Sequence, residues 1–292
     1  MYRSMLFVPG DSERKIAKSE GTEADAIILD LEDAVAPSNK PQARAMVASY
    51  LAATRGKRRA KLFVRINPLT TPEALPDLAA VMASAPDGIF QPKVSGPDDL
   101  IQLGHYLDAL EQTHGLAPES TQIIPVATET PQAMFTLGDY ARVGPRLAAI
   151  TWGAEDLSSA IGAIGNKDDN GDWSQPFTLA RSLCLFGASA AGVAALDTLY
   201  ADFRDDAGLL ESSRRARRDG FAGRIAIHPD QVATINRAFT PSDEEIAHAQ
   251  RIIDLFAANP TAGALSLDGA MVDIPHLTQA KKTVALAART RA

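Results

Sequence analysis

Short runs of apolar residues alternate along the chain with longer stretches in which apolar positions recur every three or four residues. The short runs are rich in β-branched residues and lack strict alternation, a pattern typical of parallel strands covered on both faces. The longer stretches have the period of amphipathic helices, and several begin with Pro or with a capping Ser, Thr or Asp. The predicted strands are residues 4–8, 26–31, 61–66, 88–92, 123–128, 148–152, 194–199 and 224–227. The predicted helices between them are residues 40–53, 72–85, 97–111, 131–141, 178–191 and 209–219.

Eight strands that alternate with helices predict an α/β fold of the (β/α)8 TIM-barrel type. The competing interpretation is an open doubly wound sheet, but no Gly-x-Gly-x-x-Gly follows any of the strands. The pattern continues with helices at 231–239, 242–257 and 275–289 and a turn-rich segment at 259–269. We therefore expect a barrel domain over residues 1–240 and a C-terminal helical extension over residues 241–292. This extension is more than a barrel needs, so we expect it to cover a barrel mouth or to reach a neighbouring subunit.

Composition narrows the classes of partner. The 292 residues are 46% hydrophobic, enough for a large core, and the net charge of −7 argues against a general nucleic-acid surface. The arginines at positions 214, 215, 217 and 218 are expected to form a solvated helix face. The N-terminus lacks the apolar region of a signal peptide, and no apolar run is long enough to span a bilayer. We expect a cytoplasmic chain without membrane contact, in which Cys184 is a small buried hydrophobe.

Charged residues follow several of the predicted strands. In a barrel the residues after each strand converge at one face, where active sites are built. A single acid in such a place is more often a helix N-cap than a ligand. Several acids close to two basic residues are harder to explain in this way, because buried like charges repel unless a cation offsets them. The residues concerned are Asp30, Glu32, Asp33, Arg65, Lys93, Glu129, Glu155 and Asp156.

Oxygen ligands that converge from neighbouring strand ends indicate a site for Mg²⁺. Glu129 and Asp156 are the expected ligands because strands five and six are neighbours in a barrel. Glu32 and Asp33 are better placed to hold metal-bound water. Arg65 offers a planar fork suited to a substrate carboxylate or enolate oxygen. A metal and an arginine beside a carbonyl group can stabilise an enolate, the intermediate of aldol and Claisen-type cleavage of carbon–carbon bonds.

Several segments, in order along essentially the whole chain, resemble the citrate lyase β-subunit-like proteins of the HpcH/HpaI aldolase superfamily, which includes malyl-CoA and citramalyl-CoA lyases. Each is short, but their number and order are specific. The sequence departs from the usual pattern in two places. One is Val-Ser-Gly at 94–96, after strand four, and the other is Ala-Thr at 127–128, before Glu129. Both bear on the shape of the acyl pocket. The segments are residues 4–11, 28–35, 65–68, 91–94, 129–130, 152–157, 220–224 and 227–229.

The resemblance implies a Mg²⁺-dependent TIM barrel, commonly trimeric, that cleaves or forms 3-hydroxyacyl thioesters through an acetyl-CoA enolate. Carried over by motif, Glu129 and Asp156 are metal ligands, and Arg65 and Glu129 contact the substrate. Residues 271–275 are similar to a C-terminal motif whose Asp, here Asp273, is a catalytic acid/base supplied by an adjacent subunit. The position of Asp273 just before Pro275 fits a helix N-cap equally well. Asp268 is a weaker alternative for the same role.

The remaining candidates are less specific. Arg3, Lys15 and Lys18 are candidates by position for holding CoA near the barrel mouth, and a plain surface role is equally open for them. His228, at the end of strand eight, resembles a base but is expected to be a structural hydrogen-bonding residue.

The sequence thus predicts a Mg²⁺-dependent carbon–carbon lyase acting on a malyl-CoA or citramalyl-CoA type thioester. The alternatives are a citrate lyase β subunit acting on an acyl-carrier-protein thioester and a CoA-free class II keto-acid aldolase. A further alternative is a non-enzymatic regulator that binds CoA or a keto acid.

Overall fold

The structure is a computed structural model that describes residues 2–291, except for the side chains of residues 290 and 291. Contacts within the chain divide it into two compact units, Met1–Asn236 and Arg237–Ala292. Among the described residues, no helix combines the length and the apolar character that crossing a membrane requires.

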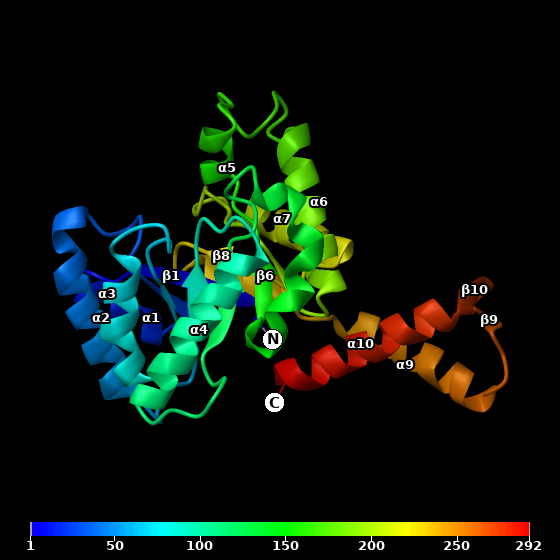
Figure 1. Cartoon of the computed structure of the whole chain (residues 1–292). Coiled ribbons are helices and arrows are strands. Elements are labelled where there is room, and N and C mark those ends of the chain that lie inside the picture. The colour runs from blue at the N-terminus through cyan, green and yellow to red at the C-terminus, as the bar shows by residue number, and fades with distance from the viewer. Residues whose placement is uncertain (1, 292) are drawn as a thin grey trace. The chain divides into compact units, whose positions relative to one another are not determined.

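Eight parallel strands, each close to its predicted position, form the centre of the first unit (Figure 1). Their order in the sheet is β5-β4-β3-β2-β1-β8-β7-β6, so the first and last strands in sequence do not lie at its edges. The sequence-based prediction of a barrel is therefore confirmed. The strands are β1 (Ser4–Pro9), β2 (Ala26–Asp30), β3 (Lys61–Arg65), β4 (Gly88–Gln91), β5 (Gln122–Pro125), β6 (Ala149–Thr151), β7 (Ala194–Asp197) and β8 (Gly223–Ala226).

The barrel closes between β5 and β6, but this seam is weaker than the other strand pairs. Two isolated bridges, Ile123 with Leu147 and Val126 with Thr151, take the place of a continuous ladder. At the carboxyl end the side chain of Thr128 completes the seam, because its Oγ1 accepts from the Gly153 amide (3.0 Å) and donates to the Gly153 carbonyl (3.1 Å).

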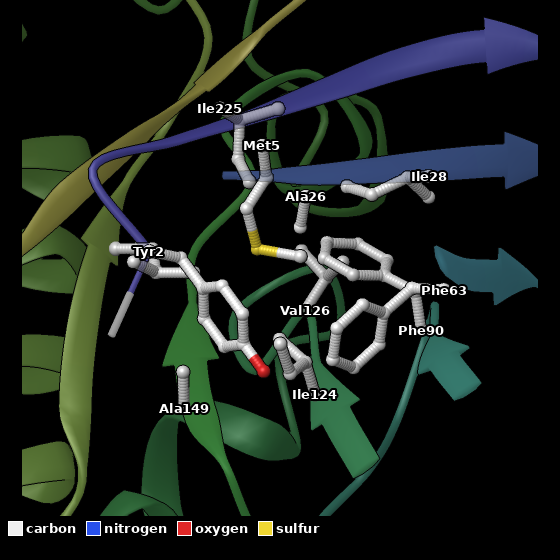
Figure 2. Close-up of a cluster of buried hydrophobic side chains, with 11 residues drawn as sticks. Tyr2, Met5, Ala26, Ile28, Phe63, Phe90, Ile124, Val126, Ala149 and Ile225 are labelled. Carbon is white, nitrogen blue, oxygen red and sulfur yellow. The ribbon is translucent and has the colours of Figure 1, made fainter. Parts of the chain in front are cut away.

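Alternation along the strands places an apolar cluster inside the barrel (Figure 2). Met5, Phe63 and Phe90 come from β1, β3 and β4 and are at most 1% exposed. Since side chains two apart on a strand share a face, Arg65 points the same way as Phe63, one layer nearer the carboxyl end. The barrel interior is therefore apolar in its middle and becomes polar at that end.

Helices surround the strands of the first unit. The predicted helix at 131–141 is wrong, because 3₁₀ turns η3 (Ala133–Phe135) and η4 (Leu137–Arg146) occupy this segment. Thr130 and Thr136 donate from their hydroxyls to the carbonyls of Val94 and Ser95, which holds the segment against the β4–α4 connection. The other elements are α1 (Glu13–Glu20), η1 (Pro37–Asn39), α2 (Lys40–Thr54), α3 (Ala74–Val81), η2 (Met82–Ser84), α4 (Pro97–Thr113), α5 (Glu155–Ala160), α6 (Gln175–Ala190), α7 (Asp206–Asp219) and α8 (Gln231–Phe239).

Beyond the end of α8, the described residues of the second unit form two helices and a β-hairpin. α9 (Asp243–Ala258) begins with a capping box in which Ser242 and Glu245 bond each other's backbone amides. The hairpin of β9 (Ala264–Leu267) and β10 (Ala270–Asp273) lies within and beyond the segment predicted to be turns. Its two-residue turn is Asp268-Gly269, both with positive φ (52° and 81°), as a type I′ turn requires. The last helix, α10 (Ile274–Arg291), packs with α9 around a small apolar core.

A buried ion pair joins the amino ends of β5 and β6. Arg146, the last residue of η4 and three residues before β6, donates from Nη1 and Nη2 to the Glu111 carboxylate of α4 at 2.9 and 2.7 Å. Glu111 also accepts from the Thr121 amide (2.8 Å), and Arg146 donates to the Thr121 carbonyl (2.9 Å). Burial alone would raise the pKa of Glu111, but these hydrogen bonds lower it to about 2. The network therefore holds together the two strands whose ladder is interrupted.

Replacing Glu111 by Gln should lower the free energy of unfolding by about 3 kcal/mol, because it removes the buried carboxylate that pairs with Arg146 and leaves only the more exposed Asp108 as its counter-ion. Urea denaturation at pH 7 measures this loss. Because the folded state favours the Glu111 carboxylate, its contribution is complete above the ordinary Glu pKa and is lost as the pH falls toward about 2. The matched control is Asp98→Asn, which breaks the exposed Arg142–Asp98 pair and should cost less than about 1 kcal/mol. Equal losses for both variants would contradict the role of the buried pair.

Candidate functional site

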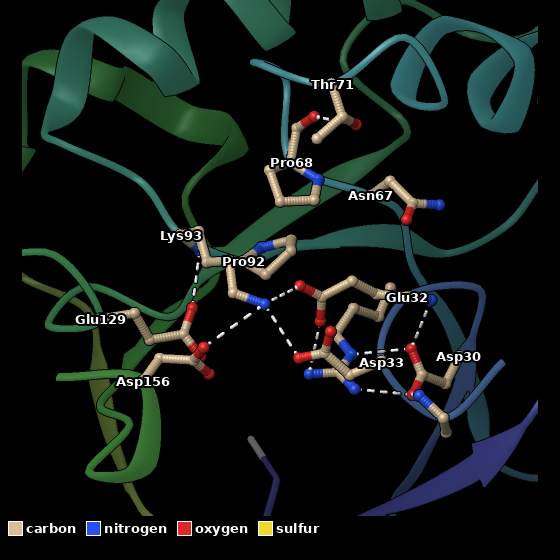
Figure 3. A network of polar contacts seen from close by, with 12 residues as sticks. Asp30, Glu32, Asp33, Asn67, Pro68, Thr71, Pro92, Lys93, Glu129 and Asp156 are labelled. Carbon is tan, nitrogen blue, oxygen red and sulfur yellow. Dashed lines mark hydrogen bonds and ion pairs between the residues drawn. The ribbon is translucent and has the colours of Figure 1, made fainter. Parts of the chain in front are cut away.

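The structure brings together the charged residues that follow β2 to β6. Figure 3 shows the carboxylates of Glu129 and Asp156 side by side, facing the ammonium of Lys93, with Glu32 and Asp33 on its other side. The parallel strands explain this, since the carboxyl ends of neighbouring strands open on the same rim. We call these residues, with Asp30 and Arg65, the acidic rim.

Arg65 is fixed by its strand and by two carboxylates. Asp30 is its direct partner in the β2–β3 register and accepts from Nε and Nη2 at 2.7 and 2.6 Å. Glu32 lies 2.9 Å from Nη1. The guanidinium also lies over the Phe7 ring, 4.5 Å from its centroid. Burial opposes the charge, but the hydrogen bonds that Arg65 donates to Asp30 outweigh it and raise the pKa of Arg65. Arg65 is therefore a rigid, permanently charged fork at the top of the barrel interior.

Lys93 contacts four acids of the acidic rim, an arrangement that no sequence pattern indicated. Its ammonium is within hydrogen-bonding distance of Glu32 and lies 2.8 Å from Asp33 and 3.5 Å from Asp156. Its backbone amide donates to Glu129 Oε2 at 2.6 Å. The backbone is left-handed at this residue, with φ of 53°, a conformation that costs about 1 kcal/mol for a residue with a Cβ. Despite burial, contacts with Asp33 and Glu32 raise the pKa of Lys93.

Glu129 is the more deeply buried of the two expected metal ligands, with 6% of its surface exposed. It lies against Gly153, where an added Cβ would come within 3.0 Å of Glu129 Cγ. Burial, followed by the charges of Asp156 and Glu32, raises the pKa of Glu129 to about 8, although the hydrogen bond from Lys93 acts in the opposite direction. A cation beside this carboxylate would favour its ionised form.

Asp156 lies in the first turn of α5, and its side chain is 37% exposed. The described residues hold no group of three or more His, Cys, Asp or Glu side chains that could enclose a metal ion by themselves. Mg²⁺ does not need such a group, because it is commonly bound by one or two carboxylates and keeps several waters. Glu32 adds a second buried carboxylate, whose Oε2 lies 2.9 Å from Nη1 of Arg65. The donor set of Glu129 and Asp156, with Glu32 beside it, therefore fits a hydrated magnesium ion.

A polar network that the sequence did not indicate supports the loop carrying Glu32 and Asp33. The ammonium of Lys40 donates to the carbonyls of Leu31 and Glu32 and to Asn67 Oδ1, at 2.9, 3.1 and 2.6 Å. Asn67 in turn donates from Nδ2 to Asp77 (2.6 Å). The loop backbone thus has fixed partners beneath it, which limits the movement of Glu32.

The three candidates for CoA contact do not lie together. Lys15 and Lys18 are exposed on α1, which follows β1 and so begins at the carboxyl end of the barrel. Arg3 precedes β1 and forms a bidentate pair with Asp25, which precedes β2, at 2.8 and 3.0 Å. The structure therefore corrects the expectation for Arg3. It lies at the amino end of the strands, away from the acidic rim, because it precedes β1, which runs along the barrel wall from Ser4 to Pro9.

Asp273 and Asp268 both belong to the second unit. Asp273 stands directly before α10, where its Oδ1 lies 2.5 Å from His276 Nδ1 and 3.5 Å from the His276 amide. The contact with His276 lowers the pKa of Asp273. Its capping geometry is thus present, and this geometry does not conflict with a second role for the carboxylate. Asp268 pairs with Arg251 at 2.5 Å in the hairpin turn.

His228 has structural partners. Its amide donates to Gln231 Oε1 (3.2 Å), and its ring stacks on Phe203 with centroids 4.6 Å apart. Gln231 also donates to the Tyr200 carbonyl (2.8 Å), so it joins the loops after β7 and β8. Cys184 is fully buried, as predicted.

The fold and the site together define a class, that of TIM-barrel proteins with an acidic site at the carboxyl ends of their strands. The HpcH/HpaI aldolase/citrate lyase family model matches residues 3–229. The chain belongs to this family, as the resemblance of its motifs predicted, and the family makes it a carbon–carbon lyase.

Three relatives cover nearly the whole chain. The mitochondrial citramalyl-CoA lyase of Rattus norvegicus is 35% identical, over 98% of this chain and 86% of its own length. The (3S)-malyl-CoA thioesterase of Cereibacter sphaeroides (strain ATCC 17029 / ATH 2.4.9) is 34% identical, over 98% and 94%. The crystal structure of CitE from Mycobacterium tuberculosis in complex with magnesium, acetoacetate and coenzyme A is 31% identical, with a TM-score of 0.78 over 98% of each chain.

The raised pKa of Glu129 predicts how the stability of the metal-free protein depends on pH. Because the folded state favours the protonated carboxyl, the contribution of Glu129 is complete below its ordinary pKa and is lost as the pH rises through about 8. Glu129→Gln should therefore melt together with the wild type at pH 5 and several degrees higher at pH 9, in thermal melts with a chelator. Glu155→Gln, at an exposed neighbouring acid, is the control. Parallel curves for Glu129→Gln and the wild type at every pH would exclude the burial of an ionisable Glu129.

Proposed function

We propose that this protein is a Mg²⁺-dependent lyase that cleaves or forms a 3-hydroxyacyl-CoA thioester of the malyl-CoA or citramalyl-CoA type. The observation that supports it best is the acidic rim, in which Glu129 and Asp156 lie side by side near Arg65. Relatives named citramalyl-CoA lyase and malyl-CoA thioesterase support the substrate class. The magnesium and coenzyme A in the CitE structure support the cofactor.

The residues of the acidic rim suit the two halves of this reaction. When bound by Glu129 and Asp156, magnesium supplies a Lewis acid for an enolate or keto oxygen. Asp30 occupies Nε and Nη2 of Arg65, and Glu32 lies 2.9 Å from Nη1, so the carboxylate of the keto acid would meet Nη1 by displacing Glu32. Glu32 and Asp33 orient water beside the ion, with Lys93 between them. Lys15 and Lys18 on α1 contact the phosphates of CoA.

Asp273 is proposed as the acid/base that moves a proton at the acetyl carbon, acting on the site of a neighbouring subunit. The proposal thus includes a homo-oligomer, of which a trimer is the expected form, and a C-terminal extension that completes the site. The cytoplasmic location expected from the sequence stays a prediction, since the relatives include a mitochondrial enzyme.

A second function is favoured by one specific similarity. The citrate lyase subunit beta of Haemophilus influenzae (strain ATCC 51907 / DSM 11121 / KW20 / Rd) is 32% identical over 96% of this chain and 95% of its own length. In that case the substrate would be an acyl-carrier-protein thioester. Turnover of free CoA thioesters by the purified chain alone would exclude an obligate carrier.

Asp156→Asn tests the metal assignment. We expect purified wild type to cleave malyl-CoA, methylmalyl-CoA or citramalyl-CoA in a mass-spectrometric screen only when Mg²⁺ is present. Asp156→Asn should lose about 100-fold or more in kcat/KM, because the ion loses one of its two charged ligands. The matched control is Glu155→Gln, the adjacent acid, whose carboxylate bonds the exposed Asn166. Full Mg²⁺-dependent activity in Asp156→Asn would contradict the assignment.

Asp273→Asn and Asp273→Ser separate capping from catalysis. Both Asn and Ser cap helices about as well as Asp, so the melting temperature should stay within about 2 °C while kcat falls by about 100-fold. The Asp273→Asn and Arg65→Met variants can also be unfolded, mixed and refolded together. Part of the activity should return, because some sites of a mixed oligomer then carry neither change. Unchanged kcat in both Asp273 variants would leave this residue as a helix cap only.

A further inference from the structure

The acidic rim has more acid than base. Its acids outnumber its cations five to two, and Arg65 is already engaged by Asp30 and Glu32. Among the ion pairs of the described residues, Lys93 is the cation that contacts both Asp33 and Asp156. The acids are Asp30, Glu32, Asp33, Glu129 and Asp156, and the cations are Arg65 and Lys93.

We propose that Lys93 is a positioning residue that serves as the built-in counter-ion of the acidic rim. Its fixed charge keeps Glu32, Asp33 and Asp156 together in the metal-free protein and at the same time weakens the binding of a divalent cation. This inference rests on the proposed magnesium site.

The geometry of Lys93 distinguishes this role from that of an ordinary ion pair. One residue contacts both expected metal ligands, with its amide on Glu129 and its ammonium near Asp156. It does so from a left-handed backbone, a conformation that favours Gly or Asn over Lys. Such a conformation persists where the surrounding contacts over-determine it, and it is concentrated at functional sites.

Removal of the Lys93 charge should then have opposite effects on the stability of the metal-free protein and on its affinity for a divalent cation. Without the ammonium, the carboxylates of the acidic rim repel one another and the metal-free protein becomes less stable. The same excess of negative charge attracts a divalent cation more strongly, because a positive neighbour has been removed. If the Lys93 side chain only filled space, its replacement would not both destabilise the metal-free protein and tighten the binding of metal.

The experiment compares Lys93→Met, which keeps the length of the side chain, with Lys93→Arg, which keeps the charge. The matched control is Lys61→Met, which removes a lysine paired with Asp87 at the amino end of β3. Thermal melts at pH 8 with a chelator measure metal-free stability. Isothermal calorimetry of the chelator-free proteins measures the affinity for Mg²⁺ alone, without substrate.

We expect Lys93→Met to melt about 5 °C below the wild type when metal-free and to bind Mg²⁺ about tenfold more tightly. Lys93→Arg and Lys61→Met should stay within about 2 °C of the wild type. If Lys93→Met unfolds without metal, Mg²⁺ should restore its folding, and Lys93→Gln repeats the test with a polar side chain. An unchanged metal-free melting temperature, weaker Mg²⁺ binding, or failure of Mg²⁺ to restore folding would each overturn the proposal.

Failure of the proposed function has a different signature. If the acidic rim bound no magnesium, the wild type would show no calorimetric signal, and Asp156→Asn would be indistinguishable from it. The loss of metal-free stability in Lys93→Met would still be observed, because it depends only on the charges of the protein.

Discussion

The surplus of negative charge at the carboxyl ends of the strands is the constraint on which the rest of the site depends. Carboxylates buried near one another raise each other's pKa unless cations offset them, and Glu129 shows the effect with a pKa of about 8. Arg65 and Lys93 offset part of the charge, each by contacts with more than one acid. Glu129 and Asp156 lie side by side within the remaining negative charge, which is where we propose that a divalent cation binds.

The barrel concentrates these acids because its geometry allows few other arrangements. Strand alternation places Phe63 in the core and Arg65 one layer above it, and register places Asp30 directly beside Arg65. The two expected metal ligands follow the two strands of the weak seam. There Thr128 bonds both polar groups of the Gly153 backbone, and the absent side chain at Gly153 leaves room for Glu129. The seam therefore combines barrel closure with the positioning of Glu129, while the Arg146–Glu111 pair holds its other end.

Local patterns predicted what depends on local sequence. Eight apolar runs identified the eight strands of the barrel, and the order of strands in a barrel was enough to place Glu129 next to Asp156. The hairpin after residue 263 was missed, although Asp268-Gly269 between apolar positions is a type I′ signal. The helix at 131–141 was predicted from its period, but Thr130 and Thr136 bond a loop far away in sequence. Arg3 was assigned to the carboxyl end of the barrel, although a residue that precedes β1 lies at the amino end of that strand.

The position of Lys93 at the centre of the acidic rim could not be predicted in the same way. Its partners come from the loop after β2, from the segment after β5 and from α5, and the contact with Glu129 needs a left-handed backbone that no neighbouring residue indicates. A lysine after a strand looks like any solvated cation in sequence. Its proposed role follows only when the charges around it are counted in space, and the same count allows a lysine beside the proposed magnesium site. Where acids outnumber cations five to two, one ammonium can stabilise the metal-free fold and still leave enough negative charge to bind a divalent ion.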